Sequence, residues 1–207
     1  MRTSLRFAAR ASLLAWAAFV SPVQAARLSP GLSAGLLLPL SSGVSDAYGA
    51  APLLTATLAY PVSRRFGVEL GVGATRLSSD LSGPSFVDDA EGTLTLLPLR
   101  LVCTWTPPAR RSRPWLALGA AAVWSREEVS YRVLDLDESL EASRFDPGAT
   151  LGGGWEWGGG GRSRIRLGAL ATLALGDREI LRAEGDPAET DGAGGTSHLS
   201  LSAEVRF

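Results

Sequence analysis

Apolar and polar residues alternate along most of this chain, in segments of about ten residues that are separated by polar or glycine-rich connections. The last segment, residues 198–207, is the clearest, because every odd-numbered residue in it is apolar and every even-numbered one is polar or charged. A period of two places such residues on opposite faces of a β-strand. The pattern predicts eight strands, at residues 30–40, 53–62, 66–76, 93–106, 114–125, 149–157, 164–175 and 198–207. Only 114–125 lacks a clear apolar face.

The connections between these segments alternate in length. Four are long and polar, and the three between them are short; the long ones are 41–51, 78–92, 126–146 and 176–195, and the short ones are 63–65, 107–113 and 158–163. Long loops at one end and short turns at the other are typical of outer-membrane barrels, whose short turns face the periplasm. The sequence therefore predicts an all-β fold, an eight-stranded antiparallel up-and-down transmembrane β-barrel, with both termini on the periplasmic side.

The first 25 residues have the features of a secretory signal peptide. Three arginines precede the short apolar run 11–20, and small residues lead up to Ala25. The run is about half the length that a membrane-spanning helix needs. We therefore expect cleavage after Ala25, which leaves 26–207 as the barrel domain.

Aromatic residues gather at the strand ends beside the short turns and at the C-terminus. Trp and Tyr prefer membrane interfaces, so this distribution predicts an aromatic girdle on the periplasmic side. Its predicted members are Tyr60, Phe66, Trp105, Trp115, Trp155, Trp157 and Phe207.

The formal net charge of -1 conceals a strong segregation of charge. Of the 21 acids, 18 fall in the four predicted loops, where only five arginines accompany them, whereas the short turns hold six arginines and no acid. We expect an acidic outer surface, which could interact with divalent cations or basic partners, and a basic periplasmic rim. The lack of overall basicity disfavours nucleic acid as a partner. The single cysteine, Cys103, allows no internal disulfide, and no metal or cofactor site is predicted.

The remaining charged residues in the strands are predicted to face the barrel interior, except Arg76, which is predicted to face outward near the long-loop rim. Eight strands enclose a space that side chains can fill, and charges in such a space must be paired. We expect an ionic cluster that closes the lumen; its predicted members are Glu69, Arg100, Glu156, Arg164, Arg166, Glu204 and Arg206. A narrow gated pore, or a transporter of small solutes or hydrophobic compounds, is the alternative that this pattern leaves open.

The signal peptide, the eight alternating segments and the C-terminal sequence 200–207 (SLSAEVRF) resemble the small outer-membrane barrels of the OmpA, OmpX and OmpW kind. The resemblance implies that the terminal aromatic Phe207 forms part of the signal recognised by the barrel-assembly machinery. Ser202 stands where glycine is common in that signal, and Val205 where an aromatic is common. Unlike full-length OmpA, this chain is expected to carry no periplasmic peptidoglycan-binding domain.

The resulting prediction is a monomeric, non-enzymatic barrel with a structural or interaction role in the cell envelope. Its expected partners are outer-membrane lipid, lipopolysaccharide, the assembly machinery and further envelope proteins. One enzymatic alternative rests on His198 and Ser200, which share a strand face and could act as base and nucleophile. Some outer-membrane lipid A deacylases carry a similar His-x-Ser arrangement.

Overall fold

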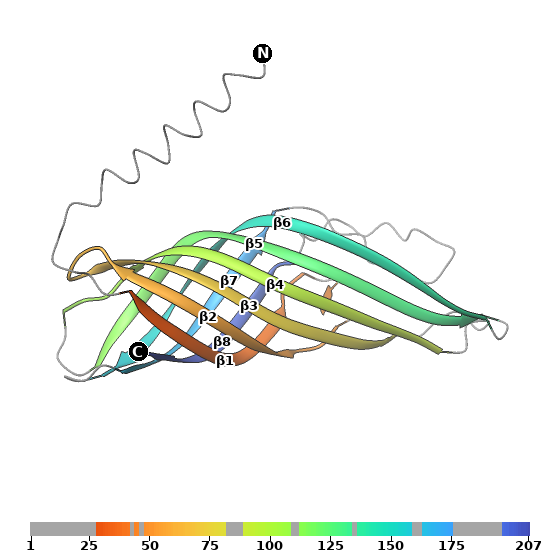
Figure 1. Cartoon of the computed structure of the whole chain (residues 1–207), viewed down its shortest axis with the longest axis horizontal. Helices are drawn as coiled ribbons and strands as arrows, with labels where there is room; N and C mark the ends of the chain where they lie inside the picture. The colour runs from red at the N-terminus through yellow and green to blue at the C-terminus, as the bar shows by residue number, and fades with distance from the viewer. Residues whose placement is uncertain are drawn as a thin grey trace, which may run out of the picture.

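The computed structural model of the chain is a closed barrel of eight strands (Figure 1). It describes residues 28–41, 44–45, 48–81, 89–108, 112–133, 136–158, 163–175 and 196–207, so the predicted signal peptide lies outside the described residues. The strands are β1 (Ser29–Pro39), β2 (Ala51–Pro61), β3 (Phe66–Leu81), β4 (Asp89–Trp105), β5 (Ser112–Val133), β6 (Leu136–Trp157), β7 (Arg164–Ala174) and β8 (His198–Arg206). In the described part of the chain, no helix is long and apolar enough to cross a membrane.

Each strand pairs antiparallel with its neighbour in sequence, and β1 closes the sheet by pairing with β8. In this closing pair Leu32 lies opposite Val205, and on its other side it lies opposite Ala56 of β2. The predicted eight-stranded antiparallel topology is therefore confirmed. The C-terminus lies at the end of the barrel where β2 turns into β3; we call this the short-turn end, and the opposite end the long-loop end.

Alternation along the strands separates an apolar outside from a filled inside. On β2, Leu54 is 66% exposed while its neighbour Leu53 is 2% exposed, and the alternation continues along the strand. The exposed leucines and valines recur on all eight strands and form a band around the barrel. An outward apolar band of this kind matches the hydrocarbon core of a membrane. In water, exposing so large an apolar surface would be unfavourable in free energy.

Two strands are much longer than the sequence pattern predicts. β5 and β6 have 22 residues each, and they remain paired from Ser112 opposite Trp157 to Val133 opposite Leu136. The prediction of a loop at 126–146 was therefore wrong, and so was the placing of 78–81 and 89–92 in a loop. About ten residues suffice to cross the bilayer, so the remainder of these strands needs no apolar outer face, and residues 126–128 and 141–144 are mostly polar or charged.

The outer parts of β3, β4, β5 and β6 form an open sheet that projects from the barrel. β2 accompanies β3 only as far as Thr75, and β7 accompanies β6 only from Gly148. Beyond these positions the four strands pair only with one another, and Figure 1 shows them continuing past the ends of β1, β2, β7 and β8. We call this the projecting sheet.

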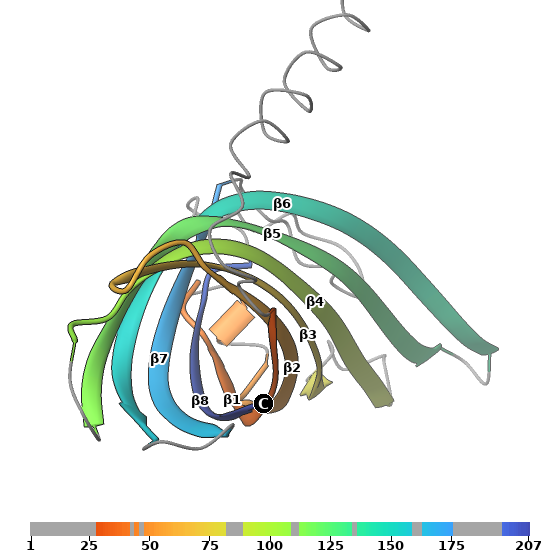
Figure 2. The same cartoon turned by 60° about the vertical axis from the view of Figure 1, so that its left-hand side comes forward.

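The connection between β1 and β2 turns into the barrel at its long-loop end. Val44 and Tyr48 of this connection are 3% and 1% exposed, and Figure 2 shows the short helical turn at Val44 inside the ring of strands. They pack with inward side chains of five strands; this outer apolar cluster comprises Leu37, Val44, Tyr48, Ala51, Leu53, Leu77, Leu94, Leu96 and Val123. These apolar side chains therefore fill part of the long-loop half of the lumen.

Candidate functional site in the barrel lumen

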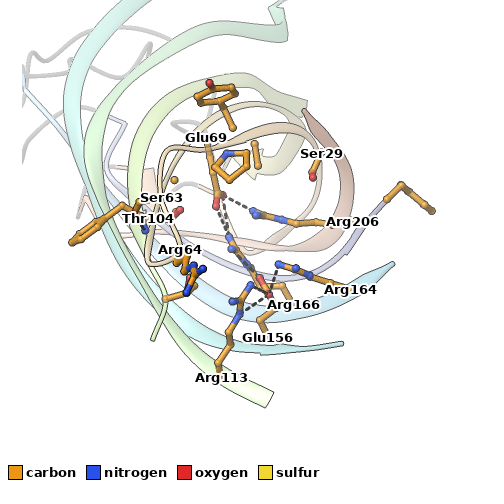
Figure 3. Close-up of a pocket in the computed structure, with 17 residues that line it drawn as sticks. Ser29, Ser63, Arg64, Glu69, Thr104, Arg113, Glu156, Arg164, Arg166 and Arg206 are labelled. Carbon is orange, nitrogen blue, oxygen red and sulfur yellow. Dashed lines mark hydrogen bonds and ion pairs between the residues drawn. The ribbon is translucent and has the colours of Figure 1, made fainter. Parts of the chain in front are cut away.

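The short-turn half of the lumen holds a buried ionic cluster built on Glu69 of β3. Arg166 of β7 donates hydrogen bonds from Nη1 to both carboxylate oxygens of Glu69, at 2.9 Å each. Arg206 of β8 donates a further hydrogen bond from Nη2 to the same carboxylate. β3 lies across the barrel from the neighbouring strands β7 and β8, so these contacts cross the lumen (Figure 3).

Glu156 of β6 forms the second centre of the cluster. Arg113 contacts its Oε1 from Nε at 2.9 Å and from Nη2 at 2.6 Å, while Arg164 donates to the same oxygen at 3.3 Å. Arg166 reaches the other oxygen of Glu156 at 3.2 Å and so links the two centres. A carboxylate with this many guanidinium donors is well compensated despite its burial.

Glu204 extends the cluster along β8. Its carboxylate accepts hydrogen bonds from Nε and Nη2 of Arg206, at 3.1 Å and 3.2 Å, and from the hydroxyl of Thr57. Six of the seven predicted lumen residues are thus joined by ion pairs. The seventh, Arg100, faces the lumen beside Gly71 and lies in the same cavity wall as Glu204, but within the described residues its guanidinium forms no direct hydrogen bond or ion pair.

Arg113 belongs to the cluster although the sequence placed it in a short turn on the periplasmic rim. The strand β5 begins at Ser112, so Arg113 shares the inward face of the strand with Trp115 and Ala117. Leu116 and Leu118, which are exposed, lie on the opposite face of the strand.

Trp115 lies inside the barrel, which corrects its prediction as a member of the aromatic girdle. It is 4% exposed, its indole Nε1 donates to the carbonyl of Leu167 at 3.3 Å, and the Arg166 guanidinium carbon lies 4.5 Å from the ring centroid. Gly168 leaves space for the ring, because a Cβ there would lie 2.2 Å from it. The indole therefore holds Arg166 by a cation–π contact. The ambiguous face of 114–125 caused the wrong prediction.

The other six predicted girdle residues lie on the outer face of the barrel or at its rim. Phe66, Trp155, Trp157 and Phe207 are exposed, and Tyr60 and Trp105 are half-buried. All six are at strand ends beside the short turns or the C-terminus. Their contact with a membrane interface stays a prediction, as does the role of Phe207 in assembly.

A pocket of about 350 Å³ opens beside the ionic cluster at the short-turn end (Figure 3). Its wall includes Arg64 of the β2–β3 turn together with six residues of the lumen, which are Glu69, Arg113, Glu156, Arg164, Arg166 and Arg206. Deeper in the lumen, the cavity beside Arg100 and Trp115 measures about 10 Å³, which is room for about one water molecule. Side chains thus leave little free space in this part of the lumen.

Two acids that the sequence assigned to an external loop lie buried in the long-loop half. Glu127 and Asp146 are each 1% exposed; the Tyr48 hydroxyl donates to Glu127 at 2.8 Å, and the Thr196 hydroxyl donates to Asp146 at 3.0 Å. Arg144 also pairs with Asp146, at 2.6 Å. The predicted surplus of acid outside the barrel is therefore smaller by these two carboxylates. The acids of 177–191 lie outside the described residues, so their part of that prediction stays untested.

His198 and Ser200 both face the lumen, 2% and 3% exposed, and use their polar atoms in backbone contacts. The Ser200 hydroxyl donates to the carbonyl of Leu170 at 3.1 Å, and His198 Nδ1 lies 2.9 Å from the carbonyl of Thr196. Neither side chain lies on the apolar outer face, where a lipid substrate would be. Among the described residues, no group of three or more His, Cys, Asp or Glu side chains is arranged to hold a metal ion.

No family model and no curated protein matches this sequence, but solved structures match its fold. The chain is similar to the outer membrane protein OprG from Pseudomonas aeruginosa, with 12% sequence identity and a TM-score of 0.52, over 87% of this chain and 96% of that one. The fold is that of a small outer-membrane β-barrel. This barrel also matches neisserial surface protein A, NspA, with 14% identity and a TM-score of 0.49, over 87% and 96% of the two chains.

Proposed function

We propose that this barrel is a non-conducting membrane anchor, which presents the projecting sheet to lipopolysaccharide or to protein partners outside the cell. The observation that carries the proposal is the filled lumen. The ionic cluster occupies the short-turn half, and the outer apolar cluster occupies the long-loop half. An ion that crossed would have to break buried ion pairs and then displace the buried side chains of the outer apolar cluster.

The orientation follows from the general layout of outer-membrane barrels, whose short turns lie in the periplasm and whose longer loops lie outside. In this orientation, both termini of the mature chain are periplasmic and the projecting sheet is extracellular. Lipid and lipopolysaccharide surround the apolar band, and the barrel-assembly machinery inserts the chain during biogenesis. Cleavage after Ala25 would release the mature barrel into the periplasm before insertion.

Conductance across planar bilayers tests the closed lumen. Purified protein, shown to be folded by a shift in gel mobility on boiling, should give no stable unitary conductance, while an open porin recorded in the same bilayers should give steps. Stable, reproducible steps from the wild-type protein would overturn the proposal and favour the narrow pore or transporter.

The interaction role can be tested with a variant that lacks the tip of the projecting sheet. Glu128 and Glu141 are register partners in β5 and β6, so residues 129–140 can be replaced by an Asn-Gly turn without changing the register below. Crosslinking on intact cells should recover partners or lipopolysaccharide with the wild type and lose them with the shortened variant. Identical recovery with both proteins would show that the projecting sheet is not the contact surface.

We infer further that the barrel has no catalytic role. The lumenal position of His198 and Ser200 supports this, since the pair is buried away from the lipid-facing surface. A deacylase assay on lipid A should show no activity for the wild type and none for Ser200→Ala. Activity of the wild type that is lost in Ser200→Ala would overturn the inference.

A further inference from the structure

The lumen cluster contains more positive than negative charge. Five arginines and three glutamates face one another in the short-turn half; they are Arg100, Arg113, Arg164, Arg166, Arg206, Glu69, Glu156 and Glu204. Arginine stays protonated in proteins, so this region carries an excess of two positive charges if the carboxylates are ionised. An uncompensated charge is costly in a narrow space between strands.

All of these residues except Arg100 and Glu204 line the open pocket, so the excess of two positive charges borders it. Arg64, at the turn between β2 and β3, lines the pocket and forms no ion pair with any described residue. Arg164 has a side chain that is 52% exposed, and it shares one oxygen of Glu156 with the closer Arg113. Both guanidinium groups therefore have donors left for a ligand.

Arg166 also has a nitrogen atom that is free to bind a ligand. Arg166 is only 4% exposed, so its Nε is shielded from water, and this atom has no hydrogen-bond partner among the described residues. Arg166 lines the pocket as well, and its planar group is held in place by Trp115. Figure 3 shows Arg113, Arg164, Arg166 and Arg206 reaching from different directions toward Glu69 and Glu156, so the guanidinium groups converge on a small region.

We infer that this pocket is a binding site for a phosphate monoester group, which enters from the short-turn end. Such a group carries about two negative charges and three terminal oxygens, and guanidinium groups bind these oxygens with paired hydrogen bonds. The excess of two positive charges thus matches this ligand better than it matches a carboxylate, which has one charge and two oxygens. The volume of about 350 Å³ admits the phosphate together with a small attached group. The hydroxyls of Ser63 and Thr104 also line the pocket and are suitable polar partners.

The group could belong to a soluble phosphate ester or to the headgroup of a phosphatidate-type lipid. Calorimetric titration of the full mature chain in phosphatidylcholine nanodiscs would use inorganic phosphate and glycerol 3-phosphate as soluble probes. A second set of nanodiscs with phosphatidic acid would test the lipid, since a bound headgroup would compete with the soluble probes. Salt near 0.15 M keeps the Debye length at about 8 Å and screens weak surface attraction.

The wild type should bind glycerol 3-phosphate saturably at one site, and acetate much more weakly. The double variant Arg64→Gln/Arg164→Gln should raise the dissociation constant by about tenfold or more, as expected when charge-assisted hydrogen bonds are lost. Arg76→Gln is the matched control, because Arg76 is exposed on β3 outside the pocket. The affinity of this variant for glycerol 3-phosphate should equal that of the wild type. Gel mobility after heating confirms that each variant is folded.

Three outcomes would overturn the inference. They are the lack of saturable binding by folded wild-type protein, equal affinities of the double variant and the wild type, and equal affinity for acetate and phosphate. If nanodiscs with phosphatidic acid suppress binding of the soluble probes and nanodiscs without it do not, the bound phosphate group is that of the lipid headgroup. If they do not suppress it, the site takes soluble esters.

Discussion

Replacing Glu69 by Gln should destabilise the barrel strongly, because Glu69 is the acceptor that joins two lumen arginines. The substitution removes the negative charge that faces Arg166 and Arg206, while it keeps the shape of the side chain. Removing one partner of a buried ion pair typically costs about 3–5 kcal/mol.

The structure favours the lower part of this range. After the change, Arg166 would retain Glu156 at 3.2 Å, and Arg206 would retain Glu204 at 3.1 Å. The Gln side chain also keeps one oxygen that can accept a hydrogen bond. We therefore expect Glu69→Gln to lower the free energy of unfolding by about 3 kcal/mol.

Urea titration in lipid vesicles, followed by tryptophan fluorescence and by gel mobility, measures this loss. Glu128→Gln is the matched control: its carboxylate is half-exposed and lies 3.9 Å from Arg126, so its removal should cost less than about 1 kcal/mol. If Glu69→Gln and Glu128→Gln had equal effects, the lumen contacts would contribute no more than surface ion pairs, and the reasoning would be refuted.

Two further substitutions test the other half of the lumen and the outer face. Tyr48→Phe removes the hydrogen bond to buried Glu127. It should lower the free energy of unfolding by about 1–3 kcal/mol in the same titration, because the carboxylate loses a donor. An unchanged midpoint would show that this hydroxyl does not hold the β1–β2 connection in the barrel. Leu118→Arg places a charge on the apolar band, where Leu118 is 67% exposed, and should cost about 2–4 kcal/mol in vesicles. Equal stability of Leu118→Arg and wild type in vesicles would place that position outside the hydrocarbon.

The sequence predicted the eight strands and their closing order because each crossing segment needs an apolar outer face. That requirement ends where the strands leave the membrane. Arg126 and Glu141 pair across β5 and β6 at 2.8 Å, yet polar residues of this kind look like loop residues when only hydrophobic periodicity is considered. For this reason the projecting sheet was missed.

The candidate site was predictable where inward charges lie on a strongly alternating strand, as with Glu69, Arg166 and Glu204. It was not predictable where the strand is rich in small residues. In β5 the alanines and Gly119 fit either face, so Trp115 was assigned to the wrong side and Arg113 to a turn. The burial of Tyr48 depends on packing between segments distant in the chain, which no local pattern reveals.

The ionic cluster also constrains the order of events during folding. Its contacts join residues far apart in sequence, with separations of 97 residues for Arg166 and Glu69 and 137 for Arg206 and Glu69. Contacts of such high sequence separation form late, once loop closure has brought the strands together. Arg206 lies on β8, whose pairing with β1 completes the barrel, so the cluster can be complete only when this seam is closed. Its contribution should therefore slow the opening of the finished barrel and leave the rate of insertion nearly unchanged.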